Sequence, residues 1–320
     1  MTRRIRLGGF YRSLPMAVAE EQGLYTAHDL EVEFDQVSSS TQQFQYLSDG
    51  RYDVVQTSPD NTANYRLNRG NPIGELVAAK GFLGLDHGMY LVVVAQPGIE
   101  STEQLRGKTI SVDAPESGFA YVMYKILANH GLQRGVDYDV VSTGGVYDRF
   151  VAMVEQGADF AATLMSGGFE TRAADRGFVL LDSVHDIYDP YLGVWAAARD
   201  EWLEGNPDLA ADFVAAYREA SDWVFDPLNR DACIERLQRL PNTSPELAER
   251  LYQIQVTPGV GNIEGGALDP AGVRNVLDLR DEFGGFEEPQ DIDELVAPSS
   301  ALFDLRFIEA SDRKRKGDRG

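Results

Sequence analysis

Cysteine is nearly absent from this sequence, because Cys233 is the only one among 320 residues. An intrachain disulfide and a cysteine-based metal site are therefore excluded, and cysteine usage leaves the redox compartment open. Lysine is also scarce, so arginine supplies 24 of the 29 basic residues. The four histidines are scattered without the spacing of metal ligands. We expect neither a metal ion nor a cofactor.

Long apolar runs are missing as well. No stretch approaches the roughly 20 apolar residues of a membrane span, so no membrane insertion is expected. The charged N-terminus resembles the start of a signal peptide, but residues 5–10 read as a strand and not as an apolar signal core. We expect a cytoplasmic location if Met1 is the native start. A removed leader would instead imply a periplasmic or extracellular protein.

Acidic residues dominate the charge, with 51 Asp and Glu giving a net charge of -22. Such a chain is repelled by nucleic acid, which we exclude as a partner. A few arginines and backbone amides inside a cleft can still bind an anion locally. The chain length and its 43% hydrophobic residues are sufficient for more than one core.

Candidate strands and helices alternate along the chain, which favours an α/β fold with mostly parallel sheets. The candidate strands are 4–8, 30–36, 52–56, 75–79, 90–95, 109–112, 138–142, 160–164, 178–181 and 191–198. The helices between them are 15–21, 41–48, 60–69, 101–105, 118–129, 147–156 and 172–176. The last third is mostly helical.

Two successive α/β units and a returning strand predict two lobes. We assign residues 1–95 and 191–312 to a discontinuous first lobe and residues 96–190 to a second lobe. The chain would cross between them twice, near 94–97 and 190–194, which makes a hinge. The basic stretch 313–320 is expected to be a disordered tail.

Several short motifs occur one after another along the chain. The segment Phe10–Ala19 combines a tyrosine loop, a proline and an alanine-rich helix, and Gln22–Tyr25 follows it. Later come Leu30–Glu33, Ser48–Val54, Leu105–Val112 and Trp202–Asp208. Together they resemble the nitrate/sulfonate/taurine-type solute-binding proteins of ABC transporters, over most of residues 5–285. The resemblance implies a two-lobed type II periplasmic-binding fold, a small-molecule ligand between the lobes and an ABC permease as partner.

The candidate ligand contacts lie in loops that follow the strands. Ligands of α/β sheets bind beyond the carboxyl ends of the strands, so these loops should face one another across the cleft. The candidates are Tyr11, Ser13, Ser39, Ser58, Asp60, Ser117, Gly118, Phe119, Gly145, Arg149 and Ser166. The serines also suit helix N-caps, and Arg149 suits an ion pair with Asp148 or Glu155.

Glu116 departs from the resembled family. The family's loop before the second lobe's long helix is implied to lay backbone amides on the anionic group of a ligand, a role that Ser117 and Gly118 fit. A carboxylate at Glu116 opposes an anion there. It suits a pair with a cationic ligand or a position in solvent, and it counts against nitrate or a sulfonate as the ligand. The expected ligand is a small organic molecule such as an aromatic acid or a heterocycle.

A cytoplasmic enzyme on the same fold is the alternative. Enzymes implied by this fold include a desulfinase-like lyase, a decarboxylase and a pyrimidine synthase, and hydrolysis is a further option. The nucleophilic cysteine of the desulfinase and the cysteine-rich motif of the synthase are both missing. What remains for chemistry is Asp60, Asp86, His87, Glu116 and Arg149. The acid-base candidates are His87, Asp60 and Glu116, and His87 with a carboxylate could act as a general base.

Overall fold

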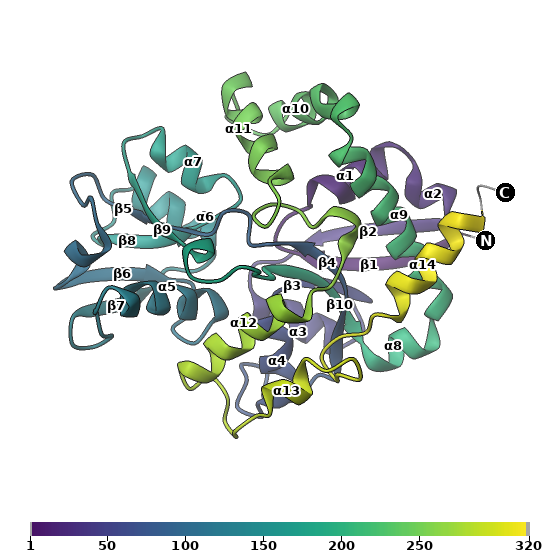
Figure 1. Cartoon of the computed structure of the whole chain (residues 1–320), viewed down its shortest axis with the longest axis horizontal. Coiled ribbons are helices and arrows are strands. Elements are labelled where there is room, and N and C mark those ends of the chain that lie inside the picture. Colours follow the sequence, from purple (N-terminus) through teal and green to yellow (C-terminus); the bar gives the residue numbers. More distant parts are fainter. Residues whose placement is uncertain (1, 318–320) are drawn as a thin grey trace.

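Two five-stranded sheets organise the chain, one in each lobe of the computed structural model, which describes residues 2–317 (Figure 1). The first sheet has the order β2-β1-β3-β10-β4, and the second has the order β7-β6-β8-β5-β9. The strands of the first sheet are β1 (Arg3–Gly9), β2 (Leu30–Gln36), β3 (Val54–Thr57), β4 (Ala79–Asp86) and β10 (Val194–Arg199). Those of the second sheet are β5 (Val92–Ala95), β6 (Lys108–Val112), β7 (Tyr138–Ser142), β8 (Ala162–Met165) and β9 (Val179–Ser183).

One strand in each sheet runs against the others. Strand β10 pairs antiparallel with β3 and β4, and β5 pairs antiparallel with β8 and β9. Strand β1 pairs in parallel with β2 and β3, and β6 pairs in parallel with β7 and β8. These two strands are the ones that follow the crossings between the lobes. The predicted architecture of two mostly parallel sheets is therefore confirmed.

Burial separates central strands from edge strands. Strands β3, β5 and β8 are buried at every residue, and their apolar runs are typical of strands covered on both faces. Strand β2 alternates apolar and acidic residues at the sheet edge, where charged side chains discourage pairing with another chain.

Helices cover both faces of each sheet (Figure 1). Those preceding the return strand are α1 (Leu14–Glu21), α2 (Leu24–Ala27), α3 (Ser40–Ser48), α4 (Pro59–Leu67), α5 (Gly118–Asn129), α6 (Val146–Phe150) and α7 (Phe169–Ala174). The C-terminal third adds α8 (Asp200–Gly205), α9 (Pro207–Phe225), α10 (Arg230–Gln238), α11 (Pro245–Val256), α12 (Pro270–Glu282), α13 (Ile292–Leu295) and α14 (Arg306–Gly317).

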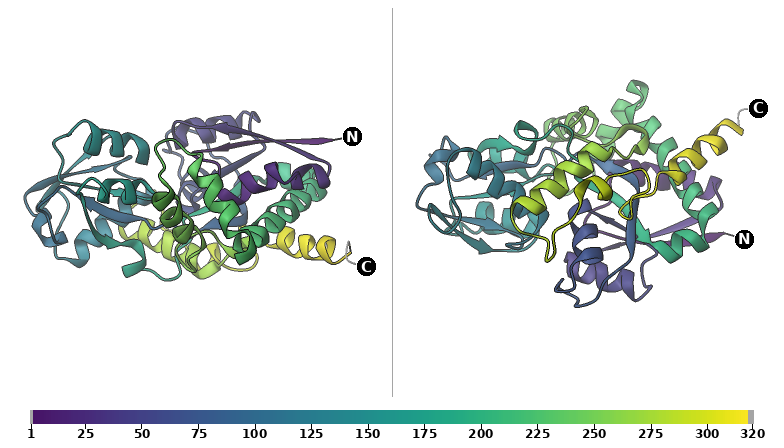
Figure 2. Two further views of the ribbon diagram at one scale, coloured as in Figure 1. Left: turned by 90° about the horizontal axis from the view of Figure 1, so that it is seen from above. Right: turned by 60° about the horizontal axis from the view of Figure 1, so that its bottom comes forward.

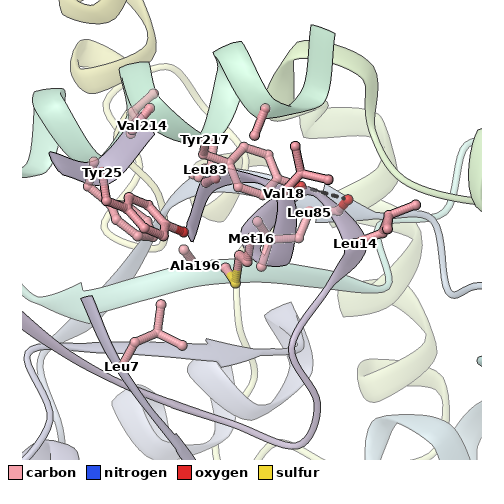
Figure 3. Packing of buried hydrophobic residues seen from close by; sticks show 14 of the residues in the cluster. Leu7, Leu14, Met16, Val18, Tyr25, Leu83, Leu85, Ala196, Val214 and Tyr217 are labelled. Atoms are coloured by element: carbon pink, nitrogen blue, oxygen red, sulfur yellow. Dashed lines mark hydrogen bonds between the residues drawn. The ribbon is translucent and has the colours of Figure 1, made fainter. Parts of the chain in front are cut away.

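The largest hydrophobic cluster lies between the first sheet and α1 and α9. In this cluster, α1 contributes Met16 and Val18, which lie near Leu7 and Ala196 of the sheet (Figure 3). Helix α9 contributes Val214 and Tyr217, which lie on the side of α1 away from the sheet (Figure 3). Cys233 is buried in the same cluster.

The C-terminal third touches both lobes. Helix α12 packs against α4 of the first lobe and α5 of the second, and α11 packs against α7 (Figures 1 and 2). On the α5 side, Lys125 pairs with Glu282 at 2.7 Å, and the rings of Tyr121 and Phe283 stack with centroids 6.0 Å apart. On the α7 side, Arg250 pairs with Asp175. Two sides of the second lobe are thus held by the C-terminal helices.

Three expected boundaries differ from the structure. Residues 75–78 are not a strand; β4 begins at Ala79, and its two glycines, Gly81 and Gly84, hide the strand pattern in the sequence. A Cβ atom on Gly81 would lie 2.3 Å from the Trp195 ring, so close packing requires glycine there.

Strand β5 pairs within the second sheet, although the prediction placed residues up to 95 in the first lobe. Residues 313–317, predicted to be disordered, continue α14. Arginine and lysine are good helix formers, which explains the continuation. Residues 318–320 of the predicted tail lie outside the described residues.

Candidate functional site

The predicted serines begin helices at the carboxyl ends of strands. Each hydroxyl oxygen accepts a hydrogen bond from an amide of its own helix, as N-cap residues do. The bonds run from the amides of Met16, Gln42, Asn61 and Ala120 to Ser13, Ser39, Ser58 and Ser117, with lengths of 3.4, 3.1, 3.1 and 3.1 Å. The capping role is confirmed, and contact with a ligand stays a prediction.

Tyr11 is anchored by Asp86, a residue considered for chemistry in the sequence but not as a partner of Tyr11. Its hydroxyl donates a 2.6 Å hydrogen bond to Asp86 at the end of β4. Although 40% of Tyr11 is exposed, its hydroxyl is enclosed, and burial first and the Asp86 carboxylate second raise its pKa well above the ordinary value. Tyr11 therefore stays protonated and fixes its loop to the crossing point.

Burial raises the pKa of Asp86 from 3.8 to about 6, against the opposing effects of hydrogen bonds from Tyr11 and the Gly88 amide. Because the folded pKa exceeds the unfolded one, this carboxyl stabilises the fold below pH 4 and loses that contribution as the pH rises through 6. The two-unit difference corresponds to about 3 kcal/mol. We expect the free energy of unfolding to fall by about that amount between pH 4 and pH 7, relative to Asp86→Asn. Parallel pH profiles for the two proteins in urea denaturation would contradict this.

Gln56 and Tyr191 are two further polar residues near Tyr11 and Asp86, and neither was predicted. The Gln56 side chain is buried beside Gly9, and neither of its amide atoms makes a hydrogen bond of good geometry within residues 2–317. It does lie close enough to the Tyr11 hydroxyl to oppose the rise in that group's pKa. Tyr191 is buried, and its pKa is raised by burial and then by Asp60 and Asp86, so its hydroxyl lies near both carboxylates. A polar residue inside the apolar run of β3 was the available signal for Gln56.

Asp60 forms a buried ion pair with Arg280 of α12. The two atoms Arg280 Nη1 and Asp60 Oδ1 are 2.9 Å apart, and both side chains are 2% exposed. Arg280 also donates to the Asn64 side chain, and its guanidinium lies over the rings of Tyr121 and Phe286. Arg280 was missed, although it lies on the stripe of Val273, Val276 and Leu277 in α12, where a charged residue needs a partner.

In the second lobe, Arg149 is held by backbone carbonyls. Its terminal nitrogens donate to Gly144 and, at 3.1 Å, to Leu164. The ion pair expected with Asp148 or Glu155 is wrong within the described chain, because Asp148 instead accepts from the Gly145 amide at 3.0 Å. Burial lowers the pKa of Arg149, with Asp113 and Asp148 opposing it.

The other predicted residues of this lobe lie around the same loops. Gly145 caps α6, and Ser166 follows β8. Phe119 and Arg149 lie close together beside the start of α5, with Asp113 and Leu164 next to them. Tyr147 is 62% exposed and packs on Phe169 with ring centroids 5.9 Å apart.

The three acid-base candidates do not form a catalytic group. His87 Nδ1 donates to the Tyr191 carbonyl at 3.0 Å, Asp60 pairs with Arg280, and Glu116 is exposed. In the part of the chain that the structure describes, no hydrogen bond or ion pair joins any two of them.

Two further classes of site are not found in residues 2–317. No three histidine, cysteine, aspartate or glutamate side chains gather there as metal ligands would. No described helix is both long and apolar enough to cross a bilayer.

Two α/β lobes joined by two crossings, with helix starts facing the junction, define the type II periplasmic-binding fold. Residues 11–228 match the family model described as NMT1/THI5 like, and the chain belongs to that family. A search of curated proteins finds no match.

Solved structures share the fold at low identity. The nitrate-binding protein NrtA from Synechocystis is similar with a TM-score of 0.77 and 13% identity, over 97% of this chain and 88% of that one. The alkanesulfonate-binding protein SsuA from Xanthomonas axonopodis gives 0.71 and 13%, over 89% and 94%. A Candida albicans protein with the generic periplasmic binding protein fold gives 0.69 and 19%, over 91% and 93%.

Proposed function

We propose that this protein is a solute-binding protein that holds a small organic molecule, a heterocycle or an aromatic acid, between its lobes for uptake by an ABC-type transporter. Such a protein works outside the cytoplasmic membrane, where the uptake system collects its solute. Closure of the two lobes is driven by the higher affinity of the closed form for the ligand. The proposal includes no chemical step.

The buried amide of Gln56, close to the Tyr11 hydroxyl, is the observation that carries this proposal. A buried amide that lacks part of its hydrogen bonding costs about 1–3 kcal/mol, and an apolar residue in this strand would avoid that cost. Gln56 lies in the central strand β3, beside Tyr11, and the loop that follows β3 begins at Ser58. An amide in this position can donate to and accept from a ligand, which favours a heterocycle or a carboxylic acid.

Ligand identity is tested by a thermal-shift screen of heterocycles, aromatic acids and sulfonates, followed by mass spectrometry of each hit. A ligand at 100 times its Kd should stabilise the fold by about 2.7 kcal/mol. Recovery of the hit unchanged supports a binding protein. Recovery of a product would overturn the proposal in favour of an enzyme.

Gln56→Leu should separate binding from stability. The substitution removes a buried amide that has only a weak contact with the Tyr11 hydroxyl, so the stability of the variant should lie within about 1 kcal/mol of that of the native protein. Its affinity for any hit should fall about tenfold or more, because that corresponds to roughly one lost hydrogen bond. The matched control is Gln43→Leu, which loses bonds to the carbonyls of Gly8 and Gln56 and should be less stable. Unchanged affinity in Gln56→Leu would remove Gln56 from the site.

A further inference from the structure

One close contact joins the starts of two helices from different lobes. A Cβ atom on Gly118, the first residue of α5, would lie 2.6 Å from Asp60 Cβ, 2.7 Å from Asp60 Cγ and 3.0 Å from Asp60 Oδ2. Asp60 is in the first turn of α4 in the other lobe. We call this contact the interlobe seam.

Only one of the two Asp60 carboxylate oxygens has a hydrogen-bond partner among the described residues. Oδ1 accepts from Arg280, whereas Oδ2 is buried and has no hydrogen-bond partner among the described residues. The whole residue is 1% exposed. Of the two carboxylate oxygens, Oδ2 is the nearer to the place where a Cβ atom on Gly118 would lie. The oxygen without a partner therefore faces the start of α5.

The start of α5 is a natural anion site. This helix has 12 residues, and the first amides of a helix have no acceptor within it and carry the positive end of its dipole. Ser117 satisfies the Ala120 amide and itself donates to Asp113 at 2.6 Å. Asp113 and the exposed Glu116 therefore add two more carboxylates beside the same helix start.

We propose that Asp60 is a built-in anion that covers the start of α5 when the lobes close, and that it determines ligand specificity. A small oxyanion such as nitrate or a sulfonate cannot share this position with a buried carboxylate. The ligand therefore presents an uncharged or positively charged group to the start of α5. This inference rests on the proposed solute-binding function and narrows its ligand class.

Asp60→Ala tests the built-in anion by chemical rescue. The variant opens a small space between the start of α5 and the guanidinium of Arg280, both of which attract an anion. Formate at about 0.1 M should raise its melting temperature by about 2 °C or more. Formamide, which has nearly the same shape without the charge, should not, at the same ionic strength. Neither compound should stabilise the native protein.

Two variants serve as controls. Asp60→Asn fills the same space without charge and should not respond to formate. Asp139→Asn removes an exposed carboxylate of the edge strand β7 and should behave as the native protein does. Equal responses of Asp60→Ala to formate and formamide would overturn the inference.

The native protein provides a second test if Asp60→Ala does not fold. Ethanesulfonate should give no shift in melting temperature beyond that of sodium chloride at equal ionic strength. Stabilisation by ethanesulfonate would overturn the inference and leave solute binding intact. Conversely, a screen without any hit would count against the proposed function while leaving the formate result unaffected.

Discussion

Arg280→Met should destabilise the protein by about 3–5 kcal/mol, the cost of removing one partner from a buried ion pair. The Asp60 carboxyl would lose its cationic partner in a site that is 2% exposed, where its other oxygen already has no hydrogen-bond partner among the described residues. Methionine retains much of the arginine stem but lacks the guanidinium that lies over the rings of Tyr121 and Phe286, and loss of these ring contacts adds to the destabilisation. The measurement is equilibrium urea denaturation at pH 7.

The matched control lies on the same helix. Arg274→Met breaks a pair with Asp293, in which the arginine side chain is 38% and the aspartate 84% exposed. Such a pair contributes about 0–1 kcal/mol. A double variant, Asp60→Leu with Arg280→Met, should recover most of the lost stability, since neither charge remains buried. Equal losses in Arg280→Met and Arg274→Met would show that the buried pair is not important for stability.

Local sequence patterns were sufficient for most of the fold. Runs such as Val54–Thr57 and Val92–Ala95 indicate central strands because both faces of the sheet are covered there. Serine followed by a helix gives the N-caps, because a hydroxyl oxygen satisfies a free amide only a few residues away. These features depend on neighbours in the chain, so a single sequence contains them.

The polar group at the junction depends on distant contacts and was only partly predicted. Asp60 was a candidate from its place after β3, but its partner Arg280 comes 220 residues later. Asp86 and Tyr191 lie at the two crossings, which bring them beside Tyr11 only in the folded protein. Arg149 was expected in an ion pair because the sequence shows nearby charges, whereas carbonyls of the folded lobe satisfy it.

Gly118→Ala should open the interlobe seam, and two physical effects of opposite sign make the result informative. In an isolated helix, replacing glycine by alanine stabilises by about 0.5–1 kcal/mol. Here the new methyl group would lie 2.6 Å from Asp60 Cβ, an atom fixed to the backbone of α4 that cannot turn away. Overpacking of this kind costs about 1–3 kcal/mol, so the steric effect should exceed the gain in helix propensity.

Denaturation and small-angle X-ray scattering together test this variant. We expect Gly118→Ala to be less stable than the native protein and to have a larger radius of gyration, because the lobes can relieve the overlap by moving apart at the crossings. Gly205→Ala is the matched control, since a Cβ atom at the end of α8 would meet nothing within 4 Å. That variant should be as stable as the native protein or slightly more stable. If Gly118→Ala gains stability as Gly205→Ala does and keeps the native dimensions, α5 and Asp60 are not in contact in solution, and the lobes of the free protein are open.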